Sequence, residues 1–543
     1  RRMAFEALRV LLDRLARHET VVLWLDDLHW GDHDSIPLFE VLAGEGPGGE
    51  PPPPCLWLLA YRDEGGELDK LAMGASASPL LGHLREARAR PDAIDVPLRP
   101  LARGEVESLA GQVFVARQAE LDAPRHAQVV AAIVEQSGGN PFIVQEFARF
   151  VAEGGHTLEQ LDWVEIVHAR LEALDPSERT LLELLAIAGR PIERDRVLAA
   201  AGLGSGARTR LAKLRATGLL RSISSDHLAG GGSSGVSLAL YHDRVRQAVL
   251  QQLDAATRST RHRRLAESLE QSGSDDLELL ALHFGAAGPE HRERALDYAI
   301  RAAERAMASV AFVRAVELFE QALRHLDSLP ATRSDDRARV LRRIGDAQAN
   351  RGRLPDAAAR YLEAARLRGG DVRRDAEVRE LSLRAGELYI KAGLLGEGWR
   401  VMRSLLEAFD VEVPRSPTRA LLGASWRRGR FVLRKLDVEA APASSNPAEL
   451  ERLELLWSAS TSLSMVNHTL ADAFRTMLLP EFAKLGPSLR CRMLAIEVAM
   501  ETHIGGPFER SATRLLEQCG RLVVRTGDPY DQAWRLLAVA NVE

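Results

Sequence analysis

The chain is poor in aromatic residues and cysteine, and it has no long apolar run. Aromatic residues make up 5% of its 543 residues, and its three cysteines are Cys55, Cys491 and Cys519. They form no CxxC pair and no even-numbered set, which excludes a disulfide framework and favours a reducing cytoplasm. No apolar stretch approaches the roughly 20 residues of a membrane-spanning helix, and no signal peptide is visible, so we expect no membrane partner.

The chain also lacks a strong net charge. It has 71 Lys and Arg against 76 Asp and Glu, a net charge of −5, which gives no global electrostatic case for a nucleic-acid partner. Hydrophobic residues make up 46%, which is ordinary for a globular protein, and the length allows three or four domains. The chain starts with arginine and stops inside an amphipathic pattern, so we expect a piece of a longer protein, cut at both ends.

A strand–helix–strand pattern lies near the start. The apolar runs VVLWL (21–25) and CLWLLAY (55–61) predict two buried parallel strands, and SIPLFEVLAG (35–44) between them predicts a helix. This is a βαβ unit, which is typical of an open α/β sheet. In such sheets, ligands bind beyond the carboxyl ends of the strands, and charged residues follow both runs.

Asp26 and Asp27 follow the first predicted strand, and Arg62 follows the second. Adjacent carboxylates diverge at a strand end, so one can hold Mg²⁺ while the other orients an attacking water. The planar guanidinium of Arg62 suits the oxygens of a terminal phosphate. The alternatives are that the aspartates only cap the next helix, and that Arg62 is a surface residue paired with a nearby acid.

Helical patterns follow from about residue 98 to 155. Gly138 and Gly139 can close one helix, and Pro141 suits the first turn of the next. This proline, in the segment GGNPF, could also press on an adenine ring. Its alternative is an ordinary helix start.

A small domain with a β-ribbon is predicted next. Several short helices are followed by strands at 219–224 and 236–241 and then by another helix, which is the winged-helix layout. The alternative is a small helical domain with a hairpin. Asp243 is the expected N-cap of the last helix. Taken alone, His242 would be a satisfied core or surface histidine.

Small and aromatic residues then recur at a fixed spacing. The positions that match a tetratricopeptide template are Leu341, Ile344, Gly345, Ala357, Tyr361 and Ala364, then Ala303, Ala315, Phe319 and Ala322, and more weakly Ala385, Gly386, Tyr389 and Met402. Residues 303, 345 and 386 are separated by 42 and 41 positions, more than the ~34 of a standard repeat. Such arrays present concave surfaces, so we expect protein or peptide partners.

Four segments follow one another along the chain in this order: VVLWLDDLHWGD, LLAYRDE, EQSGGNPFIVQEF and LYHDRVRQAV. Together with the repeats, they resemble the signal-transduction ATPases with numerous domains (STAND), a branch of the AAA+-type P-loop NTPases. More closely, the chain resembles the predicted-ATPase segment of large bacterial serine/threonine protein kinases and transcriptional regulators. The segments LERLELLWSASTSLSMVNH and RTGDPYDQAW near its end also look like those multidomain kinases. The resemblance covers most of the chain, and LDDLHWGD and GGNPF are its more specific motifs.

The resemblance implies ATP or ADP with Mg²⁺ as cofactors. Asp26 would be the Walker B acid that holds Mg²⁺ through water. Asp27 would orient the attacking water, and Arg62 would be the sensor arginine. Pro141 would be the adenine-side proline of the lid, and His242 would touch the bound diphosphate and lock the resting state.

The chain departs from this family at the phosphate-binding loop. No GxxxxGK occurs anywhere, so the backbone cradle, the lysine and the Mg²⁺-binding hydroxyl of that loop are missing, as is the first strand. We expect the intact protein to supply them before Arg1. Relatives often carry a kinase domain further upstream, but this chain has no HRD or DFG set. We therefore expect the fragment alone to be inactive.

The expected fold class is a partial α/β P-loop NTPase core, followed by a helical lid, a winged helix and an all-α tetratricopeptide-like solenoid. The expected domains are the core at 1–97, the lid at 98–160, the winged helix at 161–256, repeats at 257–410, an irregular linker at 411–447 and further helical pairs at 448–543.

The expected function is an ATP-dependent signalling switch that controls a protein-interaction array, with nucleotide-driven self-association as a further possibility. The alternative is an inert ATPase remnant that serves as a binding scaffold. A third, weaker hypothesis is DNA binding through the basic helix ARTRLAKLRATG of the winged domain.

Overall fold

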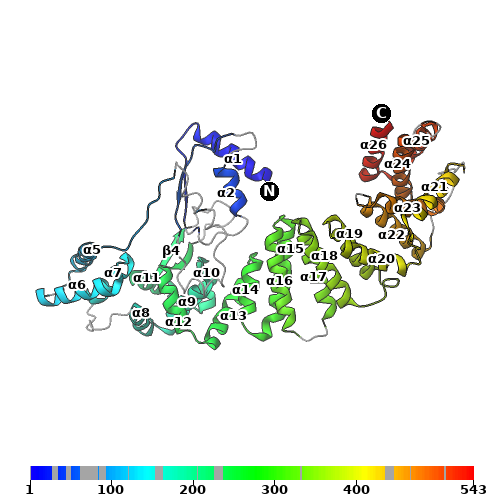
Figure 1. Ribbon diagram of the computed structural model, residues 1–543. Coiled ribbons are helices and arrows are strands. Elements are labelled where there is room, and N and C mark those ends of the chain that lie inside the picture. The colour runs from blue at the N-terminus through cyan, green and yellow to red at the C-terminus, as the bar shows by residue number, and fades with distance from the viewer. Residues whose placement is uncertain are drawn as a thin grey trace. The chain divides into compact units, whose positions relative to one another are not determined.

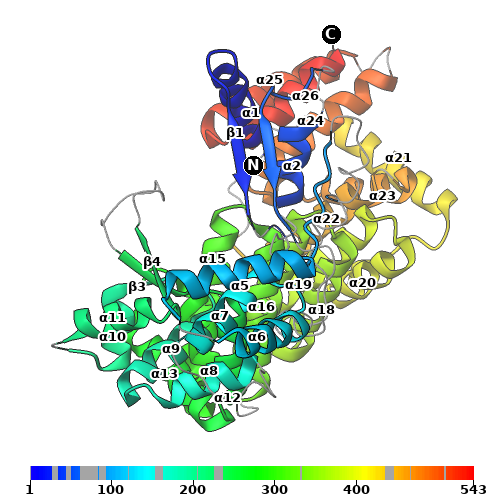
Figure 2. The ribbon, with the colours of Figure 1, turned by 90° about the vertical axis from the view of Figure 1, so that its left-hand side faces the viewer.

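The computed structural model describes residues 2–26, 28, 35–44, 50–61, 84, 93–119, 122–152, 163–204, 206–224, 236–329, 333–433, 445–464, 466–504, 506 and 509–542. They form two compact units, Arg1–Val313 and Arg314–Glu543, each described by itself. Helices dominate both units, and the sheets of the described residues are small (Figures 1 and 2). Within these ranges, no helix is both long enough and apolar enough to cross a membrane.

The first elements are α1 (Arg2–Ala16), β1 (Val22–Leu25), α2 (Ser35–Ala43) and β2 (Leu56–Leu59). The two strands pair in parallel, with Val22 opposite Leu56, which confirms the predicted strand–helix–strand order. Helix α1 packs on α2. The guanidinium of Arg9 donates hydrogen bonds of 2.7–2.9 Å to four backbone carbonyls, two at the end of α2 and two just before β2. This arginine therefore ties the ends of the α2–β2 connection to α1.

The prediction that both strands are buried is wrong for the described residues. Burial alternates along each strand, and the side chains of Trp24 and Leu56 are 71% and 55% exposed. A continuous apolar run predicts a strand covered on both faces. In the part of the chain that the structure describes, one face of this pair stays uncovered.

The next helices are α5 (Arg103–Ala116), α6 (Ala123–Ser137), α7 (Pro141–Ala152) and α8 (Trp163–Glu172). As predicted, α6 ends at Gly138 and Gly139, whose φ angles of 56° and 72° are left-handed, and Pro141 begins α7. The side-chain oxygen of Asn140 accepts hydrogen bonds from the N–H groups of Phe142 (3.0 Å) and of the following isoleucine (3.3 Å). This N-cap fixes the direction in which α7 leaves the GGNPF segment.

A small α/β region follows, with α9 (Pro176–Ala188), β3 (Ile192–Glu193), α10 (Arg194–Ala201), α11 (Ala207–Ala216), β4 (Leu220–Ser224), β5 (Val236–Leu240) and α12 (Asp243–Gln252). The strands form an antiparallel sheet in the order β3-β5-β4. Both predicted strands are confirmed. Strand β3 was not predicted, because two residues are too few to show an alternating pattern.

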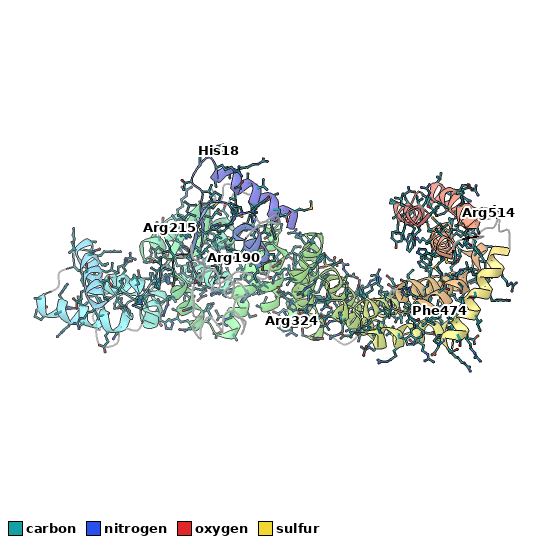
Figure 3. The ribbon with its side chains drawn as sticks, turned by 45° about the horizontal axis from the view of Figure 1, so that its top comes forward. His18, Arg190, Arg215, Arg324, Phe474 and Arg514 are labelled. Carbon is teal, nitrogen blue, oxygen red and sulfur yellow. The ribbon has the colours of Figure 1, made fainter. Side chains whose placement is uncertain are left out.

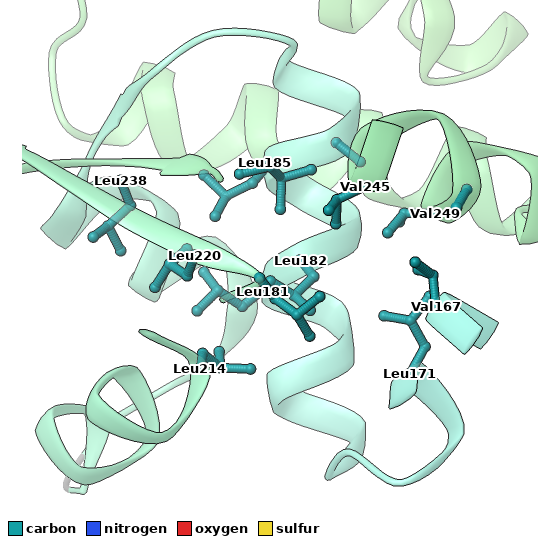
Figure 4. Close-up of a cluster of buried hydrophobic side chains, with 14 of the residues drawn as sticks. Val167, Leu171, Leu181, Leu182, Leu185, Leu214, Leu220, Leu238, Val245 and Val249 are labelled. Carbon is teal, nitrogen blue, oxygen red and sulfur yellow. The ribbon is translucent and has the colours of Figure 1, made fainter. Parts of the chain in front are cut away.

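This region has a continuous apolar core (Figure 4). Its members shown there come from α8 to α12: Val167, Leu171, Leu181, Leu182, Leu185, Leu214, Leu220, Leu238, Val245 and Val249. Helix α8 therefore packs with the small α/β region. Each leucine that loses its water contact favours folding by about 1.5–3 kcal/mol.

Three helices complete the first unit: α13 (Ala255–Gln271), α14 (Leu277–Ala286) and α15 (Arg292–Ala308), with a short 3₁₀ helix at Pro289–His291. His262 of α13 and His283 of α14 face each other, with 2.9 Å between their Nδ1 atoms. Burial lowers the pKa of His262 to about 4, with help from the charge of Arg258. Burial, together with His262, lowers the pKa of His283 to about 3. Both rings are therefore neutral in the folded protein at neutral pH.

We expect a His283→Leu variant to lose part of the parent's sensitivity to acid. Because the folded pKa lies below the ordinary value of 6.5, the neutral pair contributes fully above that pH and the contribution is lost as the pH falls toward 4. This amounts to about 1–2 kcal/mol of unfolding free energy for one histidine between roughly pH 7.5 and 5. Urea unfolding at both pH values measures it, with the exposed His18→Gln as control. Equal acid losses in the parent and the leucine variant would contradict this role.

The second unit contains α16 (Phe312–Asp327), which begins at its boundary, α17 (Ser334–Asn350), α18 (Leu354–Arg368), α19 (Ala376–Lys391) and α20 (Leu395–Ala408). Consecutive helices from α17 to α20 pack side by side (Figure 1). Most of the template residues are buried, including Phe319, Tyr361 and Met402, while Tyr389 of the weaker match is only partly buried. The repeated small–large–small pattern therefore marks the packed faces of these helices.

The turns inside the helix pairs repeat as well. Val310, Gly352 and Gly393 lie 42 and 41 residues apart, and all have left-handed φ angles of 61°, 78° and 81°. In each turn, the next residue donates a hydrogen bond of 2.8–2.9 Å to the carbonyl five positions before it. This is the Schellman arrangement, which favours glycine at the left-handed position. Val310 is therefore strained.

We expect Val310→Gly to stabilise the protein by about 1 kcal/mol. A β-branched residue in the left-handed region loses 1–2 kcal/mol, and the extra freedom of glycine in the unfolded chain offsets part of the gain. Thermal and urea unfolding measure the change. The reciprocal Gly352→Val should destabilise by at least as much, and a neutral result for both variants would contradict a shared turn geometry.

The last helices are α21 (Pro417–Leu433), α22 (Pro447–Leu463), α23 (His468–Leu478), α24 (Pro487–Ile504), α25 (Glu509–Thr526) and α26 (Pro529–Val542), with a 3₁₀ helix at Phe482–Lys484. They share a core with α19 and α20. Phe474 of α23, labelled in Figure 3, has no exposed surface in this core.

Helix α21 corrects the expectation of an irregular linker at 411–447. Pro417 starts the helix, and its inner face is apolar, with Ala420, Ala424 and Phe431 buried. The guanidinium of Arg428 contacts the carboxylates of Asp472 (2.8 Å) and Glu497 (3.0 Å). Arg428 is therefore an internal ion-pair partner of two other helices, α23 and α24. Proline- and serine-rich flanks concealed this helix in the sequence.

Candidate functional site

Asp26 lies at the carboxyl end of β1, where the sequence predicts the metal-side acid. It is exposed, and the pairing with β2 continues just around it. The N–H of Ala60 donates to the carbonyl of Leu25 (2.9 Å), and the N–H of Leu28 donates to the carbonyl of Ala60 (3.0 Å). Asp27 and Arg62 lie outside the described residues, so the paired carboxylates and the sensor arginine stay predictions.

Two other predicted segments meet in the structure. The ring of Phe142, next to Pro141 in GGNPF, stacks on the ring of His242, with centroids 4.1 Å apart and planes 8° apart. Tyr241 lies beside the same phenyl ring, at 6.1 Å. Segments about a hundred positions apart in the sequence thus form one aromatic cluster at the start of α7 and α12. We call Phe142, Tyr241 and His242 the aromatic cluster.

His242 is also the N-cap of α12, which corrects the prediction for Asp243. Its Nδ1 accepts a hydrogen bond from the N–H of Arg244 at 3.1 Å, and Asp243 is the first residue of the helix. An accepting Nδ1 carries no proton, so a neutral ring holds its proton on Nε2. The cap and the stack together fix both the tautomer and the plane of this imidazole.

Tight backbone packing holds the GGNPF segment in place. A Cβ on Gly139 would lie 2.6 Å from the carbonyl oxygen of Leu101, and the N–H of Leu101 donates to the carbonyl of Gly139 at 2.8 Å. Residue 139 must therefore be glycine for the strand-like segment before α5 to pack there. Pro141 itself is exposed, which leaves its ring accessible to a ligand.

A buried carboxylate joins α7 to its neighbours one turn beyond the aromatic cluster. Glu146 is 2% exposed and binds Arg149 of α7 (2.7 Å) and Arg170 of α8 (2.5 Å). A Cβ on Gly218, just before β4, would lie 3.0 Å from Nη1 of Arg149. Helix α7 is thus attached to the small α/β region through a ring stack and through an ion-pair cluster.

No separate feature of the sequence marks Phe142 or Glu146. Phe142 follows the predicted proline directly, so its aromatic side chain was the one feature of the sequence that could have suggested a contact there. Glu146 lies four positions further along the same helix, and only its burial distinguishes it from an exposed glutamate.

The donors that the structure describes fit only part of a Mg²⁺–nucleotide site. Within the described ranges, no group of three or more His, Cys, Asp or Glu side chains could hold a metal ion. Asp26 alone fits a single contact through water, which is what the sequence predicts for it. The sequence has no GxxxxGK loop, so the backbone cradle, lysine and hydroxyl of such a loop are absent from this chain.

No protein-family model matches the chain, and no curated protein matches it. Among solved structures, the chain is similar to the crystal structure of a signal transduction ATPase with numerous domains (STAND) protein with a tetratricopeptide repeat sensor from Pyrococcus horikoshii. The match has a TM-score of 0.32 and 13% sequence identity, and it covers 99% of this chain and 82% of that one. A likeness at this level does not establish membership of a family.

Proposed function

We propose that this chain is the coupling and sensor part of an ATP-dependent signalling switch, in which the nucleotide state controls a helical protein-binding array. The observation that carries the proposal is the stack of Phe142 on His242. It places the segment expected on the adenine side of a nucleotide in contact with the residue expected on its diphosphate side. A change at one segment is therefore passed directly to the other.

In this proposal, each residue has a limited task. Asp26 holds Mg²⁺ through water, Asp27 orients the attacking water, and Arg62 binds the terminal phosphate. Mg²⁺ bound with ATP neutralises charge on the phosphates. His242 donates its Nε2 proton to the diphosphate, because Nδ1 is already used by the backbone of α12. Loss of that bond frees α12 and the region packed on it.

The energetics require more than these residues. Shifting a two-state equilibrium from 1:99 to 99:1 takes about 5.5 kcal/mol of differential binding. Without a phosphate-binding loop, this chain lacks the backbone cradle that would supply most of that binding energy. We therefore propose that a longer form of the protein supplies the loop and also carries a serine/threonine kinase domain. The 543-residue chain alone should bind Mg-ATP weakly. Micromolar affinity in a calorimetric titration would contradict the proposal that most of the phosphate binding is supplied by a longer form of the protein.

The output side of the proposal is the helical array. Helices α16 to α20 repeat with buried small and large residues in the tetratricopeptide-like pattern, and such arrays bind proteins or peptides. Self-association driven by nucleotide is a further possible output. Elements α9 to β5 follow the order helix, strand, helix, helix and hairpin. In this proposal they are a winged-helix domain that serves as a hinge.

A binding scaffold with an inert ATPase remnant is the second candidate, and the missing GxxxxGK loop favours it. Phosphate release by a longer form that contains such a loop separates the two. The switch predicts hydrolysis by the parent and a loss of about 100-fold or more in Asp27→Asn. No hydrolysis by the parent supports the scaffold. Equal rates in parent and variant would remove Asp27 from the mechanism.

DNA binding is not part of the proposal, because α11 uses two of its basic side chains internally. Lys213 contacts the carboxylate of Glu178 at 2.9 Å, and Arg210 donates to the hydroxyl of Ser177. Both partners lie on α9. A salt-dependent shift on duplex DNA would reopen this hypothesis.

A further inference from the structure

Two of the three cysteines lie against each other in the second unit. Cys491 of α24 and Cys519 of α25 are 28 positions apart in sequence, yet their Sγ atoms are 3.4 Å apart. Both side chains have no exposed surface. The sequence suggested scattered cysteines, and the packing of α24 on α25 makes them a pair.

The third helix of this group, α26, covers the pair. The Sγ of Cys491 lies 3.9 Å from the backbone oxygen of Asp531, a fully buried residue whose carboxylate accepts a hydrogen bond from Nε of Arg492 at 2.9 Å. Arg535 of α26 packs against Gly520, the residue after Cys519, where an added Cβ would lie 3.2 Å from Nε. A guanidinium group therefore lies beside the residue that follows the second thiol.

We propose that Cys491 and Cys519 form a reversible disulfide in response to hydrogen peroxide, and that this bond links α24 to α25. A disulfide needs about 2.05 Å between the sulfurs, so the two atoms must approach by a little over 1 Å. The two sulfurs are already close enough that a change in side-chain torsion angles would bring them to bonding distance. The proposal is independent of the nucleotide switch.

The two thiols have different roles in the reaction. The hydrogen bond from Cys491 and the charge of Arg535 lower the pKa of the Cys519 thiol. The shared hydrogen bond and burial raise the pKa of the Cys491 thiol. Because its pKa is the lower of the two, we assign Cys519 as the thiol that ionises and attacks peroxide, with Cys491 as the resolving thiol.

The chemistry balances with peroxide as the only oxidant. The Cys519 thiolate attacks one peroxide oxygen, the O–O bond breaks, and hydroxide leaves and takes up a proton to become water. The sulfur of Cys491 then attacks the sulfenic sulfur of Cys519, the S–O bond breaks, and the departing hydroxide takes the Cys491 proton. In sum, two thiols and one peroxide give one disulfide and two waters. The sulfurs are oxidised and the peroxide is reduced.

Access to the pair requires an opening, because neither sulfur reaches the surface. Peroxide must enter when α26 separates locally from α24 and α25. Cys55 is only partly buried, which provides an internal reference for a thiol without a partner cysteine. Ordinary core thiols, which pack as small apolar groups, would show none of this chemistry.

The test is peptide mapping of the full chain after treatment with hydrogen peroxide, acid quenching and alkylation in denaturant. We expect a linked 491–519 peptide pair about 2 Da lighter than the two reduced peptides, which disappears after a thiol reductant. Cys55→Ser should still form it, whereas Cys519→Ser should leave Cys491 open to alkylation.

The result that would overturn the proposal is full alkylation of Cys491 and Cys519 at a peroxide dose that oxidises Cys55. A disulfide between Cys55 and either member of the pair would also overturn it. The parent chain alone decides between these outcomes, so the test does not depend on the folding of a variant.

Discussion

Replacing Glu146 by glutamine is expected to remove about 3 kcal/mol from the unfolding free energy of the first unit. The carboxylate is almost fully buried between Arg149 and Arg170, whose side chains are 29% and 14% exposed. Removal of its charge leaves two guanidinium groups near each other without a counter-ion. Breaking a buried pair in this way costs about 3–5 kcal/mol, and the partial exposure of both arginines places this site at the lower end.

Urea unfolding of the parent and of Glu146→Gln measures this loss. Glu107→Gln is the matched control, because Glu107 pairs with Arg103 on the surface, where side-chain exposures are 44% and 73%. An exposed pair of this kind is worth less than about 1 kcal/mol. Similar small losses in both variants would show that Glu146 does not hold helix α7 in place.

Gly345→Ala and Gly386→Ala are expected to differ by about 3 kcal/mol, although both glycines occupy the same template position. A Cβ on Gly345 would lie 2.6 Å from the Tyr361 ring, and that ring is held by a 2.7 Å hydrogen bond from its hydroxyl to Asp346. A Cβ on Gly386 would meet nothing nearer than 3.5 Å.

The physical reason is overpacking in one repeat and free space in the other. Forcing a methyl group into a filled contact costs about 1–3 kcal/mol, so Gly345→Ala should lose about 2 kcal/mol. Alanine is also the better helix former by up to about 1 kcal/mol, so Gly386→Ala should be neutral or stabilising. Denaturant midpoints of the second unit measure both. Two equal losses would contradict the packing described for Tyr361.

The pattern of these repeats could be predicted because it is local and periodic. Glycine or alanine at one position and a large residue sixteen positions later are visible in the sequence, as with Gly345 and Tyr361. In the repeat of Gly386, Met402 occupies the position that Tyr361 occupies in the repeat of Gly345. The tight contact in that repeat lies at Gly398 instead, where an added Cβ would lie 2.9 Å from the backbone nitrogen of Ile390. A template cannot foresee this exchange, because it depends on which side chain fills the space.

Contacts between distant segments were the main features that the sequence did not reveal. The GGNPF glycines and the start of α7 were predictable from backbone preferences. The stack of Phe142 on His242 was not, because no local rule relates residues a hundred positions apart. The same is true of Cys491 and Cys519, which look isolated in the sequence and touch in the structure.

Burial was less predictable than secondary structure. The apolar run of β1 correctly indicates a strand, but its exposure depends on what lies on each face, and Trp24 is largely exposed in the described structure. The reverse holds for α21, where Arg428 lies among acids from other helices. Strand and helix patterns report local geometry, whereas burial is decided by tertiary contacts.

The most direct test of the switch is the rate at which ADP leaves a longer form of the protein that contains a phosphate-binding loop. A bond from the His242 imidazole to a charged phosphate is worth about 1.5–3 kcal/mol, so His242→Ala should release fluorescent ADP about 10- to 100-fold faster than the parent. Phe142→Leu should show a smaller increase, and His18→Ala none. Release from His242→Ala at the parental rate would contradict the proposal that the stacked histidine senses the nucleotide.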